Sequence, residues 1–337
     1  MRRLFWIWIC FFLPITVLAV VSGLWAELQS PYYEAAEEET FIYIPPGANA
    51  AKVAGMLKEQ GILHTKLPFR LWLRRYGLDR SLKAGEYRFS GKATPIEIAE
   101  RLSRGDIYYR SITIAEGLTV METVELLARG GFGDREKLEA AILRTDLIHD
   151  LNPSAKNLEG YLFPETYRFG RRDDEEAVIG AMVNQFRNRM EKILKESPPP
   201  KGWTVARIIT LASMIEKEVK TPSEQAIVSS VMYNRLRLNM TLGIDATIIY
   251  AMKLAGTWNG IIRRSDLQMD SPYNTYIYRD LPPGPICSPG ESTIRAALNP
   301  EKTDYLYYVS KNDGTHQFSK DLRSHNNAVN LYQRSGR

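Results

Sequence analysis

The stretch TVARIITLASMIEKEVK, residues 204–220, decides how the second half of this 337-residue chain folds. Its apolar residues recur at spacings of three and four, which is the period of an α-helix. They cover more than half of the helix circumference, so we expect a largely buried helix. The apolar residues of this arc are Val205, Ile208, Ile209, Leu211, Ala212, Met214, Ile215 and Val219.

Two glutamates lie on or beside the apolar arc of this helix. At 100° per residue, Glu216 and Glu218 both project toward apolar neighbours. A carboxyl group on a buried face must be paired or protonated, and desolvation raises its pKa toward the range of a general acid at neutral pH. The alternative is an ion pair with Arg207, Arg235 or Arg237. The helical period does not choose between the two glutamates.

The segments on either side of this helix have clear local signatures. Residues 173–196 open with four carboxylates and close with Lys192 and Lys195, which suits the helix dipole at both ends. We predict a helix there, followed by a stiff linker at Pro198, Pro199 and Pro200. Further on, residues 273–290 are rich in tyrosine, proline and glycine, which predicts a long rigid loop. Such a loop suits stacking on sugar rings, and it also suits a purely structural role.

The first half of the chain predicts small β/α units. Alternating strands at residues 41–44, 85–89 and 112–114 are each followed by a turn and a short amphipathic helix. Thr94 followed by Pro95 is a typical helix start. Strand and helix must bury each other's apolar faces, so the pattern alone indicates packing rather than binding.

An uncharged run of 23 residues, residues 4–26, lies near the N-terminus. It is long enough to cross a bilayer core of about 30 Å. We expect a retained transmembrane helix rather than a cleaved signal peptide, because bulky Leu24 and Trp25 spoil a cleavage site. Arg2 and Arg3 precede the run and glutamates follow it, so the positive-inside rule predicts a cytoplasmic N-terminus and an extracytoplasmic body.

The composition excludes several classes of protein. A net charge of +5 is too small to argue for nucleic acid, and 44% hydrophobic residues argue against disorder. Cys10 and Cys287 lie too far apart for a zinc pattern or a disulfide framework, and we expect Cys287 to be a buried apolar residue. The four histidines lack metal-ligand spacing, so we expect no metal and no cofactor. There is no GxSxG elbow of a serine hydrolase.

Several long motifs in fixed order resemble the endolytic murein transglycosylase family. They are LEGYLFPETYRF (158–169), LASMIEKE (211–218), VMYNRLRLNMTLGIDATIIYA (231–251), SPYNTYIYRDLPPGPICSPG (271–290) and ALNPEKTDYLYYV (297–309), followed by HQFS (316–319) and SHN (324–326). The resemblance implies an α+β fold with a single N-terminal transmembrane helix, a LysM-like small β/α subdomain and a mixed α+β catalytic domain. The implied segments are a cytoplasmic tip (1–3), the transmembrane helix (4–26), a juxtamembrane tether (27–40), a LysM-like glycan-binding region (41–130) and the catalytic domain (131–337).

The resemblance also implies a reaction. The enzyme would cleave the MurNAc–GlcNAc β-1,4 bond within nascent peptidoglycan strands, leave 1,6-anhydro-MurNAc ends without adding water, and so terminate strand elongation. The second glutamate of the family's EKE motif corresponds to Glu218, and Glu216 would support it. Glu218 would protonate the glycosidic oxygen and then take the proton of the MurNAc C6 hydroxyl. Val219 stands where relatives often carry a hydroxyl residue, which puts the local hydrogen bonding in doubt.

The groove residues expected from the motifs could equally be structural turns and caps. They are Asn234, Asp245, Tyr273, Asn274, Thr275, Tyr276, Pro283 and Gly284. The implied partners are peptidoglycan strands and wall synthases of the penicillin-binding class, at the inner (cytoplasmic) membrane with the catalytic region in the periplasm. Two alternatives remain: a membrane-anchored peptidoglycan-binding scaffold without turnover, and a hydrolytic muramidase that uses Glu216 or Asp245 as its second carboxylate.

Overall fold

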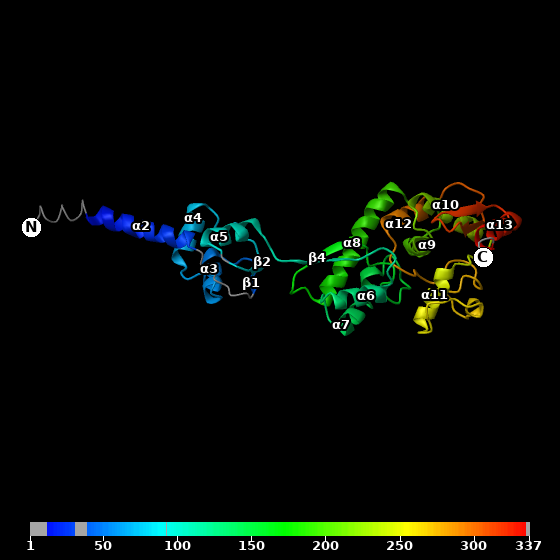
Figure 1. The fold of residues 1–337 in the computed structure, drawn as a ribbon, viewed down its shortest axis with the longest axis horizontal. Coiled ribbons are helices and arrows are strands. Elements are labelled where there is room, and N and C mark those ends of the chain that lie inside the picture. The colour runs from blue at the N-terminus through cyan, green and yellow to red at the C-terminus, as the bar shows by residue number, and fades with distance from the viewer. Residues whose placement is uncertain (1–11, 31–38, 92, 335–337) are drawn as a thin grey trace, which may run out of the picture. The chain divides into compact units, whose positions relative to one another are not determined.

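The structure is a computed structural model, and it describes residues 12–30, 39–91 and 93–334. The chain forms two compact units, Met1–Arg110 and Ser111–Arg337, which we call unit 1 and unit 2. In Figure 1 the ribbon of unit 1 runs from blue to cyan and that of unit 2 from green to red. Helices and strands occur together in both units, which confirms the mixed α+β class.

Unit 1 packs helices on a two-stranded antiparallel sheet. Its elements are α2 (Leu13–Gln29), β1 (Thr40–Ile44), α3 (Ala50–Glu59), α4 (Leu67–Arg75), β2 (Gly85–Phe89) and α5 (Pro95–Arg104). Strands β1 and β2 pair with Thr40 opposite Phe89 and Ile44 opposite Gly85. Their inward side chains share one core with the apolar faces of α3, α4 and α5.

The predicted β/α units are present. The pairs β1–α3 and β2–α5 lie in unit 1, and β3 (Arg110–Thr113) leads to α6 (Val120–Arg129) of unit 2. Thr94 begins α5 with a capping box, since its hydroxyl accepts from the Glu97 amide while the Glu97 carboxylate accepts from the Thr94 amide. Sequence analysis did not predict α4, whose alternating apolar residues hide its helical period.

The expected membrane segment is only partly described. Residues 1–3 and 4–11 lie outside the described residues, and α2 begins at Leu13. Over residues 12–30, 39–91 and 93–334, no helix has both the length and the apolar character needed to span a bilayer. Helix α2 continues to Gln29, so the first residues of the expected tether are helical, and Leu28 is buried against unit 1.

Unit 2 is mainly helical. Its helices are α6, α7 (Arg135–Ala141), α8 (Glu175–Glu196), α9 (Val205–Glu218), α10 (Pro222–Arg237), α11 (Asp245–Leu254), α12 (Glu291–Leu298) and α13 (Leu322–Val329). Short helical turns occur at η2 (Thr145–Ile148), η3 (Asp266–Gln268) and η4 (Asn330–Arg334). Strand β3 pairs with β4 (Thr166–Phe169), and β5 (Tyr307–Ser310) pairs antiparallel with β6 (His316–Ser319).

Helix α9 lies at the centre of unit 2, as its apolar arc predicts. Its residues 208–215 are all buried, and it packs against α10, α11 and α12. The helix predicted at residues 173–196 is α8, whose Asp174 caps the Ala177 amide. Residues 273–290 form the predicted loop and hold no helix, and Cys287 is buried, as expected.

Candidate active site

Glu218 is the last residue of α9, where the helix leaves the core of unit 2. The helix is fixed at its start by Thr204, whose hydroxyl accepts from the Arg207 amide, and its middle is buried. The Glu218 side chain is partly exposed, and its Oε2 accepts a hydrogen bond of 2.7 Å from the hydroxyl of Tyr308 on β5. The core therefore sets the position of the carboxyl group, and the β5–β6 hairpin holds it from the other side.

Glu218 lies at the wall of an open cavity of about 690 Å³. The walls come from α9, α10, the turn before α11, the β5–β6 hairpin and α13, so segments far apart in the sequence meet there. Polar and aromatic side chains dominate the lining, which suits a sugar polymer. The polar and aromatic lining residues are Glu218, Arg235, Thr241, Asp245, Tyr276, Tyr307, Tyr308, Ser310, His316, His325, Asn326 and Gln333.

The environment of Glu218 favours its protonated form. Burial raises the pKa of the Glu218 carboxyl, and the negative charge of Asp245 raises it further. The hydrogen bond from Tyr308 and the nearby His316 and Arg235 lower the pKa, but burial dominates. The result is a carboxyl group that holds its proton to higher pH than an ordinary glutamate, which is what a general acid requires.

No arginine neutralises this carboxyl by direct pairing within the described residues. Arg235 donates its Nε hydrogen to the carbonyl of Leu306 at 2.6 Å and one Nη1 hydrogen to the carbonyl of Leu242 at 2.8 Å. Arg207 pairs instead with Asp280, at 2.8 Å. Neither Arg207 nor Arg235 therefore forms the ion pair with Glu216 or Glu218 that the sequence left open. Arg235 acts on Glu218 only at longer range.

Glu216 faces a different part of unit 2. Its Oε2 accepts from the Gly290 amide at 2.9 Å and from the Thr293 hydroxyl at 2.7 Å, at the start of α12. A Cβ at Gly290 would lie 2.1 Å from Oε1 of Glu116, so the exposed carboxylate of Glu116 would have to move aside. Glu216 therefore anchors α12 on α9, and it does not line the cavity around Glu218.

Two of the expected groove residues lie beside Glu218. Asp245 begins α11 and Tyr276 belongs to the long loop, and both line the cavity. The hydroxyl of Tyr276 donates to Oδ1 of Asp245 at 2.5 Å. Burial and this carboxylate raise the pKa of Tyr276, so the phenol stays protonated and Asp245 remains its acceptor.

Three other expected residues have hydrogen bonds inside the fold. The Asn234 amide donates to the carbonyls of Thr303 and Tyr305 at 2.9 and 3.0 Å. Asn274 is fully buried, and Thr275 accepts the amide hydrogen of Ile244 at 2.9 Å. None of the three lines the cavity. Asn274 and Thr275 hold the segments that carry Tyr276 and Asp245, and Asn234 ties α10 to the segment before β5.

The remaining expected residues lie elsewhere on the loop. The ring of Tyr273 packs against Tyr250 with centroids 4.9 Å apart. A Cβ at Gly284 would come within 3.4 Å of the Tyr273 hydroxyl, and Pro283 is exposed. These three residues do not line the cavity that contains Glu218.

Sequence analysis missed the residues that the last segment brings to the site. Tyr308 donates to Glu218, and His316 and His325 line the same cavity. All three residues lie in motifs that resemble the family, at 297–309, 316–319 and 324–326, but the motifs alone imply no role for them. Ninety positions separate Tyr308 from Glu218, so spacing along the chain carries no signal of their contact.

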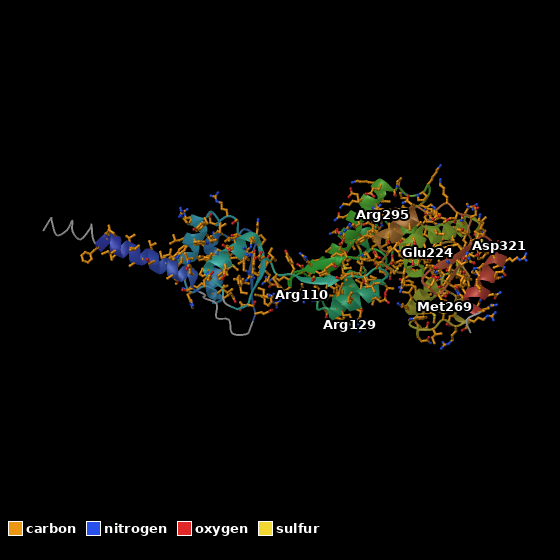
Figure 2. The ribbon with its side chains drawn as sticks, turned by 45° about the horizontal axis from the view of Figure 1, so that its top comes forward. Arg110, Arg129, Glu224, Met269, Arg295 and Asp321 are labelled. Atoms are coloured by element: carbon orange, nitrogen blue, oxygen red, sulfur yellow. The ribbon has the colours of Figure 1, made fainter. Side chains whose placement is uncertain are left out.

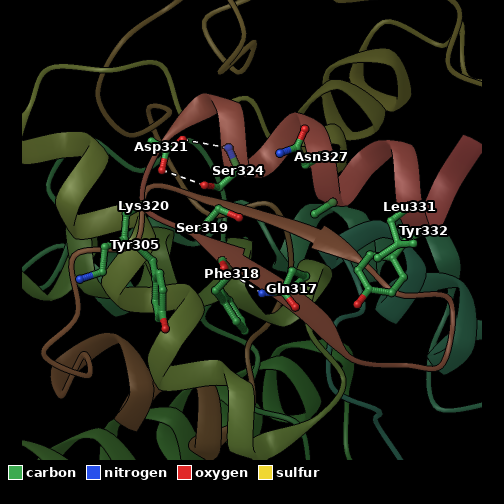
Figure 3. A pocket seen from close by; sticks show the side chains of 11 residues that line it. Tyr305, Gln317, Phe318, Ser319, Lys320, Asp321, Ser324, Asn327, Leu331 and Tyr332 are labelled. Atoms are coloured by element: carbon green, nitrogen blue, oxygen red, sulfur yellow. Dashed lines mark hydrogen bonds between the residues drawn. The ribbon is translucent and has the colours of Figure 1, made fainter.

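A second cavity, of about 470 Å³, lies between the hairpin and the C-terminal helical turns. Figure 3 shows Tyr305, Phe318 and Gln317 on one side of it and Leu331 and Tyr332 on the other. Glu218 and the expected groove residues are absent from its lining. In the described part of the chain, no group of three or more His, Cys, Asp or Glu residues is arranged to hold a metal ion.

Comparison with known proteins gives the family. Residues 42–331 match the profile of the YceG-like family. The chain belongs to this family. A relative in Bacillus subtilis named endolytic murein transglycosylase is 33% identical, over 86% of this chain and 84% of that protein. One of the same name in Streptococcus pneumoniae is 26% identical, over 85% of this chain and 57% of that longer protein.

The YceG-like fold is also known from a solved structure. A crystal structure of a YceG-like protein from Listeria monocytogenes aligns with a TM-score of 0.57 at 29% identity. The alignment covers 87% of this chain and 99% of the other. This YceG-like chain therefore shares its architecture with that protein over most of its length.

Proposed function

We propose that this chain is an endolytic murein transglycosylase that cleaves the MurNAc–GlcNAc β-1,4 bond within peptidoglycan strands. The observation that carries the proposal is the Glu218 carboxyl, whose pKa is raised by burial and which lies at the wall of an open polar cavity. Relatives across most of the chain's length carry this name. Cleavage within nascent strands would terminate their elongation.

The chemistry needs one acid. Glu218 protonates the glycosidic oxygen, and the C6 hydroxyl of MurNAc displaces it at C1 to form the 1,6-anhydro end. Because no water enters, no second carboxylate is required to activate water. Tyr276 and Asp245 lie where the strand would contact the cavity wall, and we propose that they help to orient it.

The muramidase alternative has one observation in its favour. Asp245 lines the same cavity as Glu218, and its charge acts on the Glu218 carboxyl. It is therefore placed to be a second carboxylate, whereas Glu216 is engaged at α12. A hydrolase of this kind would release ordinary reducing MurNAc ends.

Mass analysis of digested peptidoglycan tests the proposal. The full-length protein in detergent should release fragments with anhydro-MurNAc ends. Glu218→Gln should abolish them, and the matched control Glu216→Gln should retain them, because only Glu218 reaches the cavity. Reducing ends would identify a muramidase. Binding to sacculi without products from the unaltered protein would identify a scaffold.

We also propose a single-pass protein of the inner (cytoplasmic) membrane with its N-terminus in the cytoplasm and its catalytic region in the periplasm. The support is the uncharged run at residues 4–26 and the exposed apolar side chains along α2. Near the end of α2, the rings of Trp25 and Trp72 pack with their centroids 5.9 Å apart. The ring centroids of Trp72 and Tyr76 are 4.1 Å apart. Tryptophan and tyrosine are typical of a membrane–water interface.

Protease digestion of spheroplasts tests this topology. External protease should degrade unit 2 and leave a protected membrane-bound fragment, and a soluble chain in the cytoplasm would survive intact.

We further propose that residues 41–130 form the LysM-like glycan-binding region, that residues 131–337 form the catalytic domain, and that penicillin-binding wall synthases are neighbours. Co-purification after crosslinking in growing cells would reveal such a synthase, and its absence would remove that partner.

A further inference from the structure

A largely buried acid–imidazole pair lies beside the Glu218 cavity, and its imidazole is part of the cavity lining. Glu224 sits in the first turn of α10, and its Oε1 accepts the backbone amide hydrogen of His316 at 3.0 Å. Its Oε2 lies 2.7 Å from Nδ1 of the His316 ring. The side chains are only 14% exposed for His316 and 12% for Glu224. Both carboxylate oxygens are thus used to fix one residue, and Glu224 lies among the packed side chains of unit 2 (Figure 2).

The hydrogen bond decides where the ring carries its proton. A carboxylate only accepts hydrogen bonds, so Nδ1 of His316 must be the donor, and in the neutral ring Nε2 keeps a free lone pair. Within residues 12–30, 39–91 and 93–334, no group makes a hydrogen bond to Nε2, and the ring lines the cavity.

His316 and Glu218 are close neighbours across one tyrosine. The hydroxyl of Tyr308 donates to Glu218, and the Tyr308 ring meets the His316 ring edge-on with centroids 5.6 Å apart. The two groups come from different elements, α9 and β6, and both line the same cavity. Charged and titratable groups near His316 include Glu224 on α10, Glu218 on α9 and Tyr308 on β5. Arg235, Asp245 and His325 line the same cavity.

We propose that His316, held by Glu224, is the base of the reaction: its Nε2 takes the proton of the MurNAc C6 hydroxyl while Glu218 protonates the leaving oxygen. This inference rests on the proposed function. It gives the acid role to Glu218 and the base role to His316, where a single carboxylate would otherwise act first as acid and then as base. Glu224 is a positioning residue that fixes the tautomer and stabilises the imidazolium.

The protons and bonds balance. The bond between C1 of MurNAc and O4 of GlcNAc breaks, and O4 receives the Glu218 proton. The bond from O6 to C1 forms, and the O6 proton passes to Nε2 of His316. Transfer of that proton from the imidazolium to the Glu218 carboxylate, directly or through water, restores both groups. No water is consumed and no oxidant or reductant is needed.

A substrate that needs no acid separates the two roles. In a short glycan chain ending in MurNAc with a dinitrophenyl aglycone, the aryloxide leaves without protonation, but O6 must still lose its proton. On ordinary strands, Glu218→Gln and His316→Gln should each lower kcat by at least about 100-fold. On the aryl glycoside, the kcat of Glu218→Gln should recover to within about tenfold of that of the unaltered protein. The kcat of His316→Gln should remain low on this substrate.

The double variant and a chemical rescue complete the test. Glu218→Gln combined with His316→Gln should release no aryloxide, and added imidazole should restore turnover to His316→Ala but not to Glu218→Ala. Glu224→Gln should lower kcat with little change in KM. His149→Gln, at an exposed histidine of the same unit, is the matched control, and thermal unfolding verifies that each variant is folded.

Two results would overturn the assignment. Glu218→Gln could be as inactive on the aryl glycoside as on strands, which would mean that one carboxylate does both tasks. On the aryl glycoside, the double variant could instead form anhydro product as fast as Glu218→Gln alone, which would show that His316 takes no part in the reaction. Failure of the proposed function itself would look different, because the unaltered protein would then form no anhydro ends from strands.

Discussion

Replacing Asn274 by alanine should destabilise unit 2 by about 3 kcal/mol. Asn274 is fully buried, and its Nδ2 donates to the carbonyls of Leu267 and Met269 at 3.1 and 2.8 Å. Its Oδ1 accepts the amide hydrogen of Tyr276 at 2.9 Å. Each lost hydrogen bond costs about 1 kcal/mol, and alanine leaves three partly buried backbone groups without this partner. Turnover should also fall, because Asn274 holds the backbone of Tyr276 beside Asp245.

Pulse proteolysis of the full-length protein in detergent, over a series of urea concentrations, measures this change as survival of unit 2. With a urea dependence of about 1 to 3 kcal/mol per molar, the midpoint should drop by about 1 to 3 M. Asn299→Ala is the control, since Asn299 also makes two hydrogen bonds but is exposed, so water replaces them. If the midpoint of Asn274→Ala drops no further than that of Asn299→Ala, the assigned loop-holding role is wrong.

Three further changes have definite expected outcomes. Tyr308→Phe removes the hydroxyl that favours the ionised form of Glu218, so the pKa of Glu218 should rise. The descending limb of the plot of kcat/KM against pH should then move to higher pH, and a move to lower pH would contradict this. Burial raises the pKa of Glu159 to about 8 from an ordinary 4.5, so the stability it supports is complete below pH 4.5 and is lost as the pH rises to about 8. Glu159→Gln should flatten that dependence in thermal unfolding, and an unchanged slope would refute it. Glu216→Ala should cost about 1 to 3 kcal/mol in urea unfolding, because the Gly290 amide loses its acceptor, with anhydro products retained; a change of product would give Glu216 a chemical role.

Local signals in the sequence predicted most of the elements. The period of residues 204–220 gave α9, and the threonine cap before Pro95 gave the start of α5. Such features depend on residues within one or two turns of each other, so the chain displays them directly. The long loop at residues 273–290 was predicted in the same way, from its prolines and glycines.

The roles of the loop residues depended on information that the local sequence does not contain. Its tyrosines and amides suggested sugar contacts, and only Tyr276 of the run 273–276 lines the cavity. A buried loop has no strand or helix ladder to satisfy its backbone, so side chains must do so. Asn274 and Thr275 perform this task, and composition alone does not distinguish it from ligand binding.

The partners of Glu218 were hidden for a related reason. The helical arc placed Glu218 beside apolar residues, which left either a raised pKa or an ion pair, and in the structure the pKa is raised. Tyr308 and His316 reach it only because the β5–β6 hairpin packs beside α9 and α10, and no periodicity encodes that packing. Glu216 and Glu218 are two positions apart, so α9 turns them toward different neighbours, α12 and the hairpin.

Tyr308 follows Glu218 by ninety positions, which also sets the order in which the growing polypeptide acquires the two residues. At about 5 to 20 residues per second, the ribosome adds the tyrosine about 5 to 18 seconds after the glutamate. Until the hairpin that follows has been made, α9 ends in a carboxyl group without its tyrosine and without the imidazole opposite it. Under the proposed reaction, a nascent chain therefore lacks its base until residue 316 has been synthesised.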